Sequence, residues 1–504
     1  MPLFQFFPLP FWLVLVAIAV FAVRSWRQSE SSLRLPMLMV LLTATVWYVG
    51  DVLYNDYTEY LVEIDEASLW YAWWEVLTFI CAFGIFTPMV HRAFNRKYLG
   101  RPSNLLYLVR HGGLKAEGFQ TPIDSACLIL ALLWIGLMVV ALVRTDFDFK
   151  GLFMPYLGLK ADPWGRGRIG SGFDSLIALA SYTMIGLTSL FGVLVAVAMR
   201  PATRLIAIII CLLTLPTYIF DRTRSVMLVT FLPGFLTWVF MRVRGGIFVK
   251  AVILLIGFVV VEGWLKFVIE NRTDTKIAAV FQQGGSFQNN DPAGGKHLGL
   301  NMFEELGFIN SLIADGSYRP NWGERYFAEL VNPIPRALWS GKPLVGIDYA
   351  IARGQGFDNA DDNEAGVGAS ISTGMIGQGV VNFGGILGPL AAALLMALWV
   401  AILARQDLLA TEVWRLFLYI LGLILTFNMG RDITLLVIYP FCIGYLLLLL
   451  WQGWQAVTQQ RLAPSRAVGA VNQASPSRNP EVILNGTRRN RRIRSTFLKK
   501  KRRK

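Results

Sequence analysis

The chain has 504 residues, a net charge of +14, and a composition that is 55% hydrophobic and 16% charged. Soluble domains carry about 25% charged residues. With a mean hydropathy of +0.50, this chain has too little polar surface to cover itself in water, which excludes a soluble globular protein. Its four cysteines lie in apolar stretches without a Cys-x-x-Cys spacing, so neither a disulfide framework nor a zinc site is indicated.

In chain order, apolar runs of about membrane-spanning length recur from the N-terminus to residue 451. The first run has no basic residue before it and no small-residue cleavage site after it, so we interpret it as a span that is retained. The sequence therefore predicts an all-α, polytopic membrane protein of about eleven transmembrane helices. The runs are 4–23, 35–50, 69–90, 125–143, 175–199, 205–220, 226–241, 247–265, 384–404, 413–428 and 434–451.

Lysine and arginine are distributed unevenly among the loops between the predicted spans. Alternate loops and the segment after residue 451 together carry 30 Lys and Arg against 6 Asp and Glu, and the positive-inside rule places them in the cytoplasm. The N-terminus is then expected on the periplasmic side and the C-terminus in the cytoplasm. The basic tail is expected to be disordered and to lie near anionic membrane lipids, and we expect no binding to nucleic acid.

This topology predicts one extramembrane part that is large enough to build a site, a loop of about 115 residues on the outer side. The loop holds two amphipathic runs, Leu298–Ala314 and Trp322–Leu330. The second must end before Asn332-Pro333, because the residue before a proline is pushed out of the helical region. The predicted regions are an N-terminal bundle of eight spans (1–265), the periplasmic loop (266–382), a C-terminal bundle of three spans (383–452) and the tail (453–504).

Several arginines stand on the outer side, where the positive-inside pattern disfavours them. Two lie in the short turn 221–225, one follows Ile334-Pro335, and one lies in the turn 428–432. A guanidinium offers planar, bidentate donors suited to phosphate oxygens, although interfacial snorkelling or pairing with neighbouring aspartates is the alternative. We expect a site that binds a lipid-linked diphosphate. Its candidate residues are Arg222, Arg224, Arg336, Lys342 and Arg431.

Two sequence elements resemble the Wzy-type polysaccharide polymerases, the oligosaccharide repeat-unit polymerases of bacterial envelopes. NPIPRALWSGKP matches the family's first element at Pro335, Arg336, Trp339, Lys342 and Pro343. ISTGMIGQGVVNFGGILGP matches the second at Thr373, Gly377, Asn382, Phe383 and Gly384. The pairs Arg224-Ser225 and Arg431-Asp432 resemble two further arginine pairs of the family. The family usually has a glutamate where this chain has Gln378, which cannot act as a carboxylate base.

The resemblance implies a GT-C-like glycosyltransferase in the bacterial inner (cytoplasmic) membrane. Such an enzyme polymerises undecaprenyl-diphosphate-linked repeat units at the periplasmic face, without a cofactor or a metal ion. Its product is O-antigen, capsule or exopolysaccharide, and the sequence does not distinguish these. The implied partners are the lipid-linked substrates, membrane lipids, and the flippase and chain-length regulator of the same pathway.

Catalysis of this reaction needs stabilisation of the leaving diphosphate and a proton acceptor. Donors aimed at developing charge are typically worth about 10²–10³ in rate, so Arg224, Arg336 and Arg431 are the predicted catalytic arginines. His297, the histidine predicted outside, is one candidate base, and glutamates 304, 305 and 324 are others. Glu75, inside the third span and near its outer end, is an intramembrane carboxylate of the kind that is often functional.

Two alternative functions remain open at this point. A ligase that transfers the finished polymer to another acceptor would need the same arginines. A transporter or flippase would have charged residues along the bundle interior and internal repeats. Only Glu75 and Glu262 lie well inside the predicted spans and no repeat is evident, so polymerisation is favoured.

Overall fold

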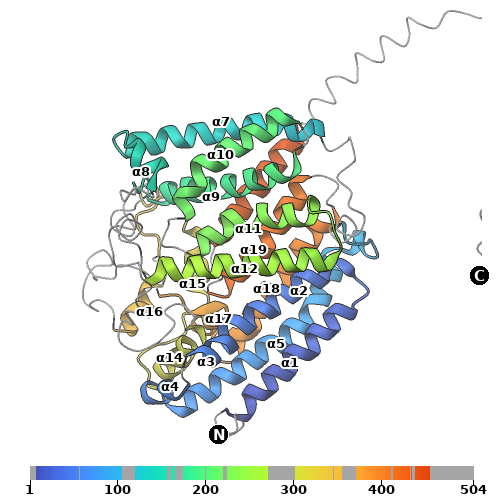
Figure 1. The fold of residues 1–504 in the computed structure, drawn as a ribbon. Coiled ribbons are helices and arrows are strands. Elements are labelled where there is room, and N and C mark those ends of the chain that lie inside the picture. Colours follow the sequence, from blue (N-terminus) through green and yellow to red (C-terminus); the bar gives the residue numbers. More distant parts are fainter. Residues whose placement is uncertain are drawn as a thin grey trace, which may run out of the picture. The chain divides into compact units, whose positions relative to one another are not determined.

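All regular secondary structure in the described part of the chain is helical (Figure 1). The structure, a computed structural model, describes residues 7–55, 57–104, 120–155, 161–164, 174–198, 200–219, 224–270, 301–343, 346–354, 371–409, 413–431, 433 and 437–454. The chain divides into two units, Met1–Leu446 and Leu447–Lys504. Of the second unit, the described residues are the end of one helix. Beyond residue 454, the predicted tail lies outside the described residues.

Eight segments in the described ranges are long and apolar enough to cross a membrane. They are α1 (Leu9–Arg27), Ser31–Leu53, α5 (Glu66–Phe94), Cys127–Arg144 of α7 (Gln120–Arg144), Leu176–Val197 of α9 (Asp174–Val197), α10 (Pro201–Ile219), α18 (Leu387–Leu408) and Val437–Trp454. Shorter apolar segments lie in α11 (Arg224–Met241), α12 (Ile247–Glu270) and α19 (Val413–Met429). The prediction of a polytopic helical membrane protein is confirmed, and the count of eleven spans stays a prediction.

Large apolar side chains are exposed along these helices. Leu132 on α7 is 60% exposed and Val260 on α12 is 65% exposed, and both have many apolar neighbours that are equally exposed. A protein in water would bury such continuous apolar faces. Within a membrane they contact lipid, and the helices satisfy their own backbone groups as the hydrocarbon region requires.

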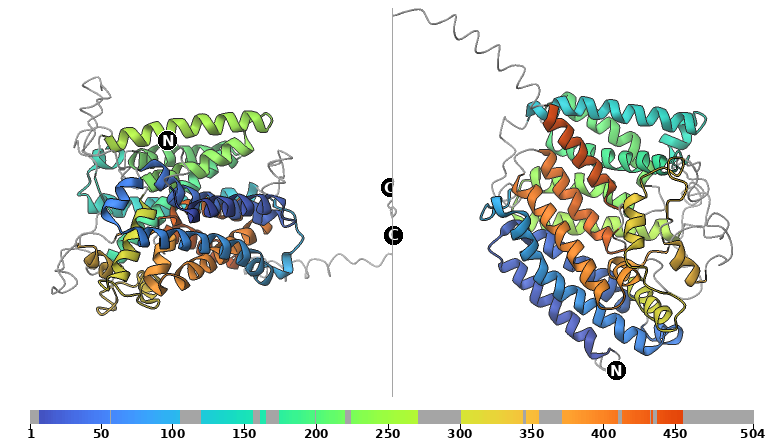
Figure 2. Two further views of the ribbon diagram at one scale, coloured as in Figure 1. Left: turned by 90° about the horizontal axis from the view of Figure 1, so that it is seen from below. Right: turned by 180° about the vertical axis from the view of Figure 1, so that it is seen from behind.

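Helices from the two ends of the sequence lie side by side in the first unit. The long α5 packs along α18 and α1, and α2 (Ser31–Ala44) packs against α18 and α19 (Figure 2). Gly379 and Gly388 let the backbones of α17 (Gly374–Phe383) and α18 touch, since a Cβ on either would overlap the other helix. Glycine pairs of this kind are the usual means of close helix approach in membranes.

The large loop folds into short helices near one end of the bundle. These are α14 (Met302–Ala314), α15 (Glu324–Val331), α16 (Ile347–Ala352) and α17. Helices form over most of both amphipathic runs predicted from the sequence, and α15 ends directly before Asn332-Pro333 as expected. Residues 298–300 of the first run lie outside the described residues. Residues 374–382, predicted as the end of the loop, are buried in α17 among α14, α5 and α18.

Asp51 fastens the first loop helix to the bundle. It lies in α3 (Gly50–Tyr54) and is fully buried. Its Oδ2 accepts the backbone N–H groups of Phe303 at 2.7 Å and Glu304 at 3.2 Å, and its Oδ1 accepts from Asn55 and Tyr60, both at 2.8 Å. Unpaired donors and a negative charge at a helix start stabilise each other, so Asp51 caps α14 from another helix.

Candidate functional site

The candidate site is arranged around α17. Gly374, its first residue, has a φ of +74°, and a Cβ there would collide with the hydroxyl of Tyr48. Glycine is suited to both the backbone conformation and the close approach. Tyr48 belongs to a π-helical turn, η2 (Thr45–Val49), between α2 and α3. Turns of this type are frequent at functional sites.

The first backbone N–H groups of α17 are bonded within the protein. Gly374 N and Met375 N donate to the carbonyls of the Gly430–Arg431 turn at 2.8 and 3.2 Å. Ile376 N donates to the Tyr48 hydroxyl at 2.8 Å. A helix start can bind an anion through such groups when they are free. In α17 these N–H groups already have partners within the protein, so an anion at this site would have to be bound by side chains.

Gln378 has a scaffolding role at the position where the resembled family usually has glutamate. It is fully buried, and its Oε1 accepts the backbone N–H of Ile433 at 2.8 Å. This bond ties α17 to the turn that carries Arg431. An amide oxygen accepts the bond as a carboxylate would, so the contact needs no charge. Thr373, directly before α17, is also fully buried.

The end of α17 is joined to the start of α15. Asn382 is buried, donates from Nδ2 to Gln378 O at 2.7 Å and accepts from Tyr326 N at 3.2 Å. The Phe383 ring lies 6.1 Å from the Tyr326 ring. Gly384 has a φ of +80° and ends the helix. The second of the two family-like sequence elements therefore fixes α17 against the start of α15.

The Pro-Arg element forms a turn that Lys342 holds closed. Lys342 Nζ donates to Asn332 O and Ile334 O, both at 2.8 Å. Burial and then the nearby Arg336 lower the pKa of Lys342. Two of its three donors thus serve the turn itself. Arg336 Nη1 donates to Ser340 O at 2.9 Å, while its Nε and Nη2 are buried with no hydrogen-bond partner.

Beside this turn lies an exposed apolar surface. The helix α15 buries Arg325 and Glu329 and turns Phe327 and Leu330 outward, which reverses the usual orientation of an amphipathic helix on a protein core. Pro335 is buried, Pro343 is half-buried, and the Trp339 ring lies 6.4 Å from that of Phe327. We call this set the α15 apolar surface: Trp322, Phe327, Leu330, Ile334, Leu338 and Trp339.

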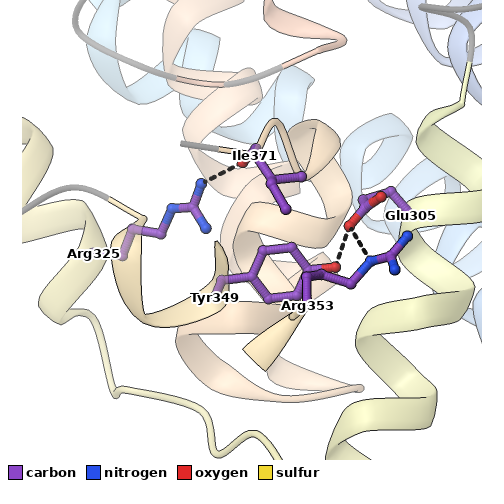
Figure 3. A network of polar contacts seen from close by, with 5 residues as sticks. All are labelled: Glu305, Arg325, Tyr349, Arg353 and Ile371. Atoms are coloured by element: carbon purple, nitrogen blue, oxygen red, sulfur yellow. Dashed lines mark hydrogen bonds and ion pairs between the residues drawn. The ribbon is translucent and has the colours of Figure 1, made fainter. Parts of the chain in front are cut away.

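Two arginines converge on the two residues that precede Thr373. Arg431, which is exposed, donates from Nε to Ser372 Oγ at 2.9 Å. Arg325 is only 3% exposed and donates from Nη2 to Ile371 O at 3.3 Å (Figure 3). Its Nε and Nη1 are buried with no hydrogen-bond partner. A buried guanidinium with one long hydrogen bond and no carboxylate is costly unless an anion joins it.

The neighbouring Arg353, in contrast, is paired. Its Nε lies 3.2 Å from Oε1 of the buried Glu305, and its guanidinium covers the Phe308 ring at 3.5 Å. The Tyr349 hydroxyl donates to the same carboxylate oxygen, and burial followed by Glu305 raises the pKa of Tyr349. Figure 3 shows this pair on one side of Tyr349 and Arg325 directed toward Ile371 on the other. The network pairs Arg353 with Glu305 and does not include Arg325.

The structure thus connects part of the predicted site. Arg336 and Lys342 share one turn, and Arg431 is joined to the start of α17. His297 and Arg222 lie outside the described residues. Arg224 begins α11, but its side chain is outside the described part. Arg325 was missed, and a sequence signal for it exists: Arg325, Ala328 and Glu329 share one face of the run from Glu324 to Val331.

The fold and the exposed apolar helices define the class: a polytopic helical membrane protein with a folded loop region at one end of its bundle. Among the residues that the structure describes, no group of three or more His, Cys, Asp and Glu side chains could hold a metal ion. No family model matches the chain, and comparison with curated proteins and with solved structures finds no match.

Proposed function

We propose that this protein is a GT-C-like membrane glycosyltransferase that polymerises undecaprenyl-diphosphate-linked oligosaccharide units at the periplasmic face of the inner membrane. One observation supports this above the others. Arg325 and Arg336 each keep two buried guanidinium nitrogens without a protein hydrogen-bond partner. Arg325 lies on the buried face of α15, and Arg336 follows Ile334 of the α15 apolar surface. Buried donors of this kind call for an anionic ligand.

A lipid-linked diphosphate combines the two chemistries that this arrangement offers. Its phosphate oxygens accept bidentate, charge-assisted hydrogen bonds from guanidinium groups. Its polyprenyl chain favours an apolar surface at membrane depth, which Trp322, Phe327 and Leu330 would supply. A soluble sugar phosphate would use the arginines and leave the apolar surface unexplained.

The proposed chemistry needs little beyond positioning and charge. As the bond between the donor sugar and its phosphate breaks, negative charge grows on the diphosphate, and fixed arginines stabilise that charge more than the ground state. Arg325 and Arg336 are the proposed diphosphate ligands, with Arg431 at the adjoining Ser372. Lys342 supports Arg336 by holding its turn.

Gene deletion with complementation tests the proposal. The deletion strain is expected to accumulate single repeat units on lipid, and the wild-type gene to restore polymer. Arg325→Ala and Arg336→Ala are expected not to restore it, whereas Arg319→Ala, a control at an exposed arginine of the same loop, is. Full-length polymer left unattached to its acceptor would identify a ligase instead. Normal polymer from both arginine variants would refute the site.

A further inference from the structure

Glu75 is a buried carboxylate that the diphosphate site does not use. It lies in the first half of α5, within a membrane-spanning helix, and is 5% exposed. Its Oε2 accepts from Asn310 Nδ2 of α14 at 2.9 Å. Its Oε1 is buried and has no hydrogen-bond partner.

Either protonation state of Glu75 leaves a polar group unsatisfied in the protein alone. A carboxylate would have one bare oxygen, and a carboxylic acid would have either a donor or an acceptor without a partner. Leaving such a group unsatisfied costs about 1–3 kcal/mol. A ligand hydroxyl removes this cost in both states, because it donates to a carboxylate and accepts from an acid.

Gly385, between α17 and α18, leaves room beside this oxygen. A Cβ at Gly385 would lie 3.2 Å from Glu75 Oε1 and, chain neighbours aside, would meet no other described atom within 4 Å. Gly385 itself is exposed. The absence of a side chain at this exposed glycine therefore leaves only backbone between the surface and Oε1, and a ligand hydroxyl would reach the buried oxygen from this side.

The two ends of α17 lie near different polar groups. At its start lie Ile371 and Ser372 with their arginines, and just past its end lies Gly385 beside Glu75. Ten helical residues span about 15 Å at a rise of 1.5 Å per residue. In the proposed reaction, the acceptor hydroxyl and the diphosphate would lie on opposite sides of the anomeric carbon of the donor sugar, toward these two ends of α17.

We propose that Glu75 is the general base of this enzyme and binds the hydroxyl of the acceptor sugar. This inference rests on the proposed function. The hydroxyl oxygen forms a bond to the anomeric carbon of the donor sugar, and its proton passes to Glu75 Oε1. The bond from that carbon to the phosphate oxygen breaks, and its electron pair stays on the lipid diphosphate. Asn310 positions the carboxylate through Oε2.

The surroundings of Glu75 hold no second charge in contact with it within the described residues. Among the helices packed against α5, α14 meets Glu75 with the neutral Asn310, and α17 has no ionisable side chain. The basic residues Arg96 and Lys97 of η3 (Arg96–Tyr98) follow the opposite end of α5. On α5, α1 and α18, the other charged or titratable groups stand at the helix ends. They are Glu66, His91 and Arg92 on α5, Arg24 and Arg27 on α1, and Arg405 and Asp407 on α18. On α14, Glu304 and Glu305 stand in the first turn.

The test compares Glu75→Gln with Glu66→Gln, the same substitution at an exposed position of the same helix. The full protein is reconstituted in vesicles with a lipid-diphosphate-linked repeat unit, and the rate of polymer formation is measured against pH. General-base catalysis is worth about 10²–10⁴, so Glu75→Gln is expected to lose at least about 100-fold in kcat. The wild-type rate is expected to rise with pH as Glu75 loses its proton, and this rise should be absent in Glu75→Gln. Retention of labelled undecaprenyl diphosphate should be the same in the variant and the wild type.

Glu66→Gln is expected to behave as wild type. Gly385→Ala, which narrows the space beside Oε1 without touching the carboxylate, is expected to raise KM for the acceptor unit and lower kcat several-fold. Wild-type kcat and pH dependence in Glu75→Gln, or wild-type kinetics in Gly385→Ala, would overturn the assignment of Glu75. If wild-type protein consumes no lipid-linked unit, the proposed function itself fails, which is a separate result.

Discussion

Replacing Arg325 by methionine should raise thermal stability while it strongly lowers activity. Arg325 is 3% exposed and carries two buried guanidinium nitrogens without hydrogen-bond partners, so the unliganded protein bears the desolvation cost of a poorly bonded charge. Exchange of buried ionic groups for apolar residues is often neutral or stabilising by about 1–4 kcal/mol. We expect Arg325→Met to gain about 1–3 kcal/mol in the absence of substrate.

Arg353→Met provides the matched control for this prediction. Arg353 is paired with the buried Glu305 at 3.2 Å, so its loss leaves a buried carboxylate without its cation. Breaking a buried pair costs about 3–5 kcal/mol, and the partial exposure of Arg353 places the expected loss near about 3 kcal/mol. The same substitution, made at two arginines of the same loop, should therefore change stability in opposite directions.

The assay follows tryptophan fluorescence during heating of the purified protein in detergent, with and without undecaprenyl diphosphate. A ligand that binds the folded state raises Tm by mass action, so wild-type Tm should rise with the lipid and the Tm of Arg325→Met should not. The polymerisation rate of Arg325→Met should fall by about 10²–10³, the usual loss for one such donor. A drop in Tm like that of Arg353→Met, or an undiminished rate, would refute the reasoning.

Three further predictions concern the scaffold. Asp51→Ala removes the acceptor of four buried donors and should cost about 3 kcal/mol or more, measured as lower Tm and faster amide exchange in α14. Gly379→Ala should cost about 1–3 kcal/mol, measured by Tm, because the new Cβ would overlap the carbonyl oxygen of Gly388. Asp65 caps α5 through Ser68 N at 2.9 Å, so Asp65→Ala should cost about 1 kcal/mol at neutral pH, measured by Tm. Since hydrogen bonds from Ser68 lower the pKa of Asp65, this contribution is present above pH 4 and is lost as the pH falls through the folded-state pKa.

Two of these predictions have a control variant in the same protein. Gly136→Ala on α7 introduces a Cβ that meets no described atom within 4 Å and should leave Tm unchanged or slightly higher. Asp65→Ser keeps a capping oxygen and should retain most of the stability at neutral pH. Equal Tm values for Asp51→Ala and wild type would show that α14 is held by apolar packing alone. An Asp65→Ala difference that persists in strong acid would contradict the capping role.

Much of the architecture follows from the sequence because the membrane imposes it. About twenty apolar residues are needed to cross the hydrocarbon region, and helices are the simplest way to satisfy a backbone there. The helical segments therefore appear where the apolar runs lie. Local chemistry also predicts the C-terminal end of α15, since Asn332-Pro333 cannot continue it. The resemblance in sequence motifs predicts that Arg336 and Arg431 bind the diphosphate, and the structure shows which residues surround them.

Other features depend on which segments meet in three dimensions. The ten residues of α17 are too short and too rich in glycine to read as a span, and they are buried only because α14, α5 and α18 enclose them. The capping of α14 joins Asp51 to Phe303, 252 positions apart along the chain. Local patterns carry no information on such pairs.

The sequence by itself determined the class of this protein, through the length and hydropathy of its helices, and it located arginines that merit attention. Only the tertiary structure decided which polar groups lack partners. Arg325 is buried without a counterion and Glu75 Oε1 without a donor, because satisfaction of a charge depends on neighbours from distant segments. Lys342, expected to bind a ligand, is instead bonded to the backbone of its own turn through two donors for the same reason.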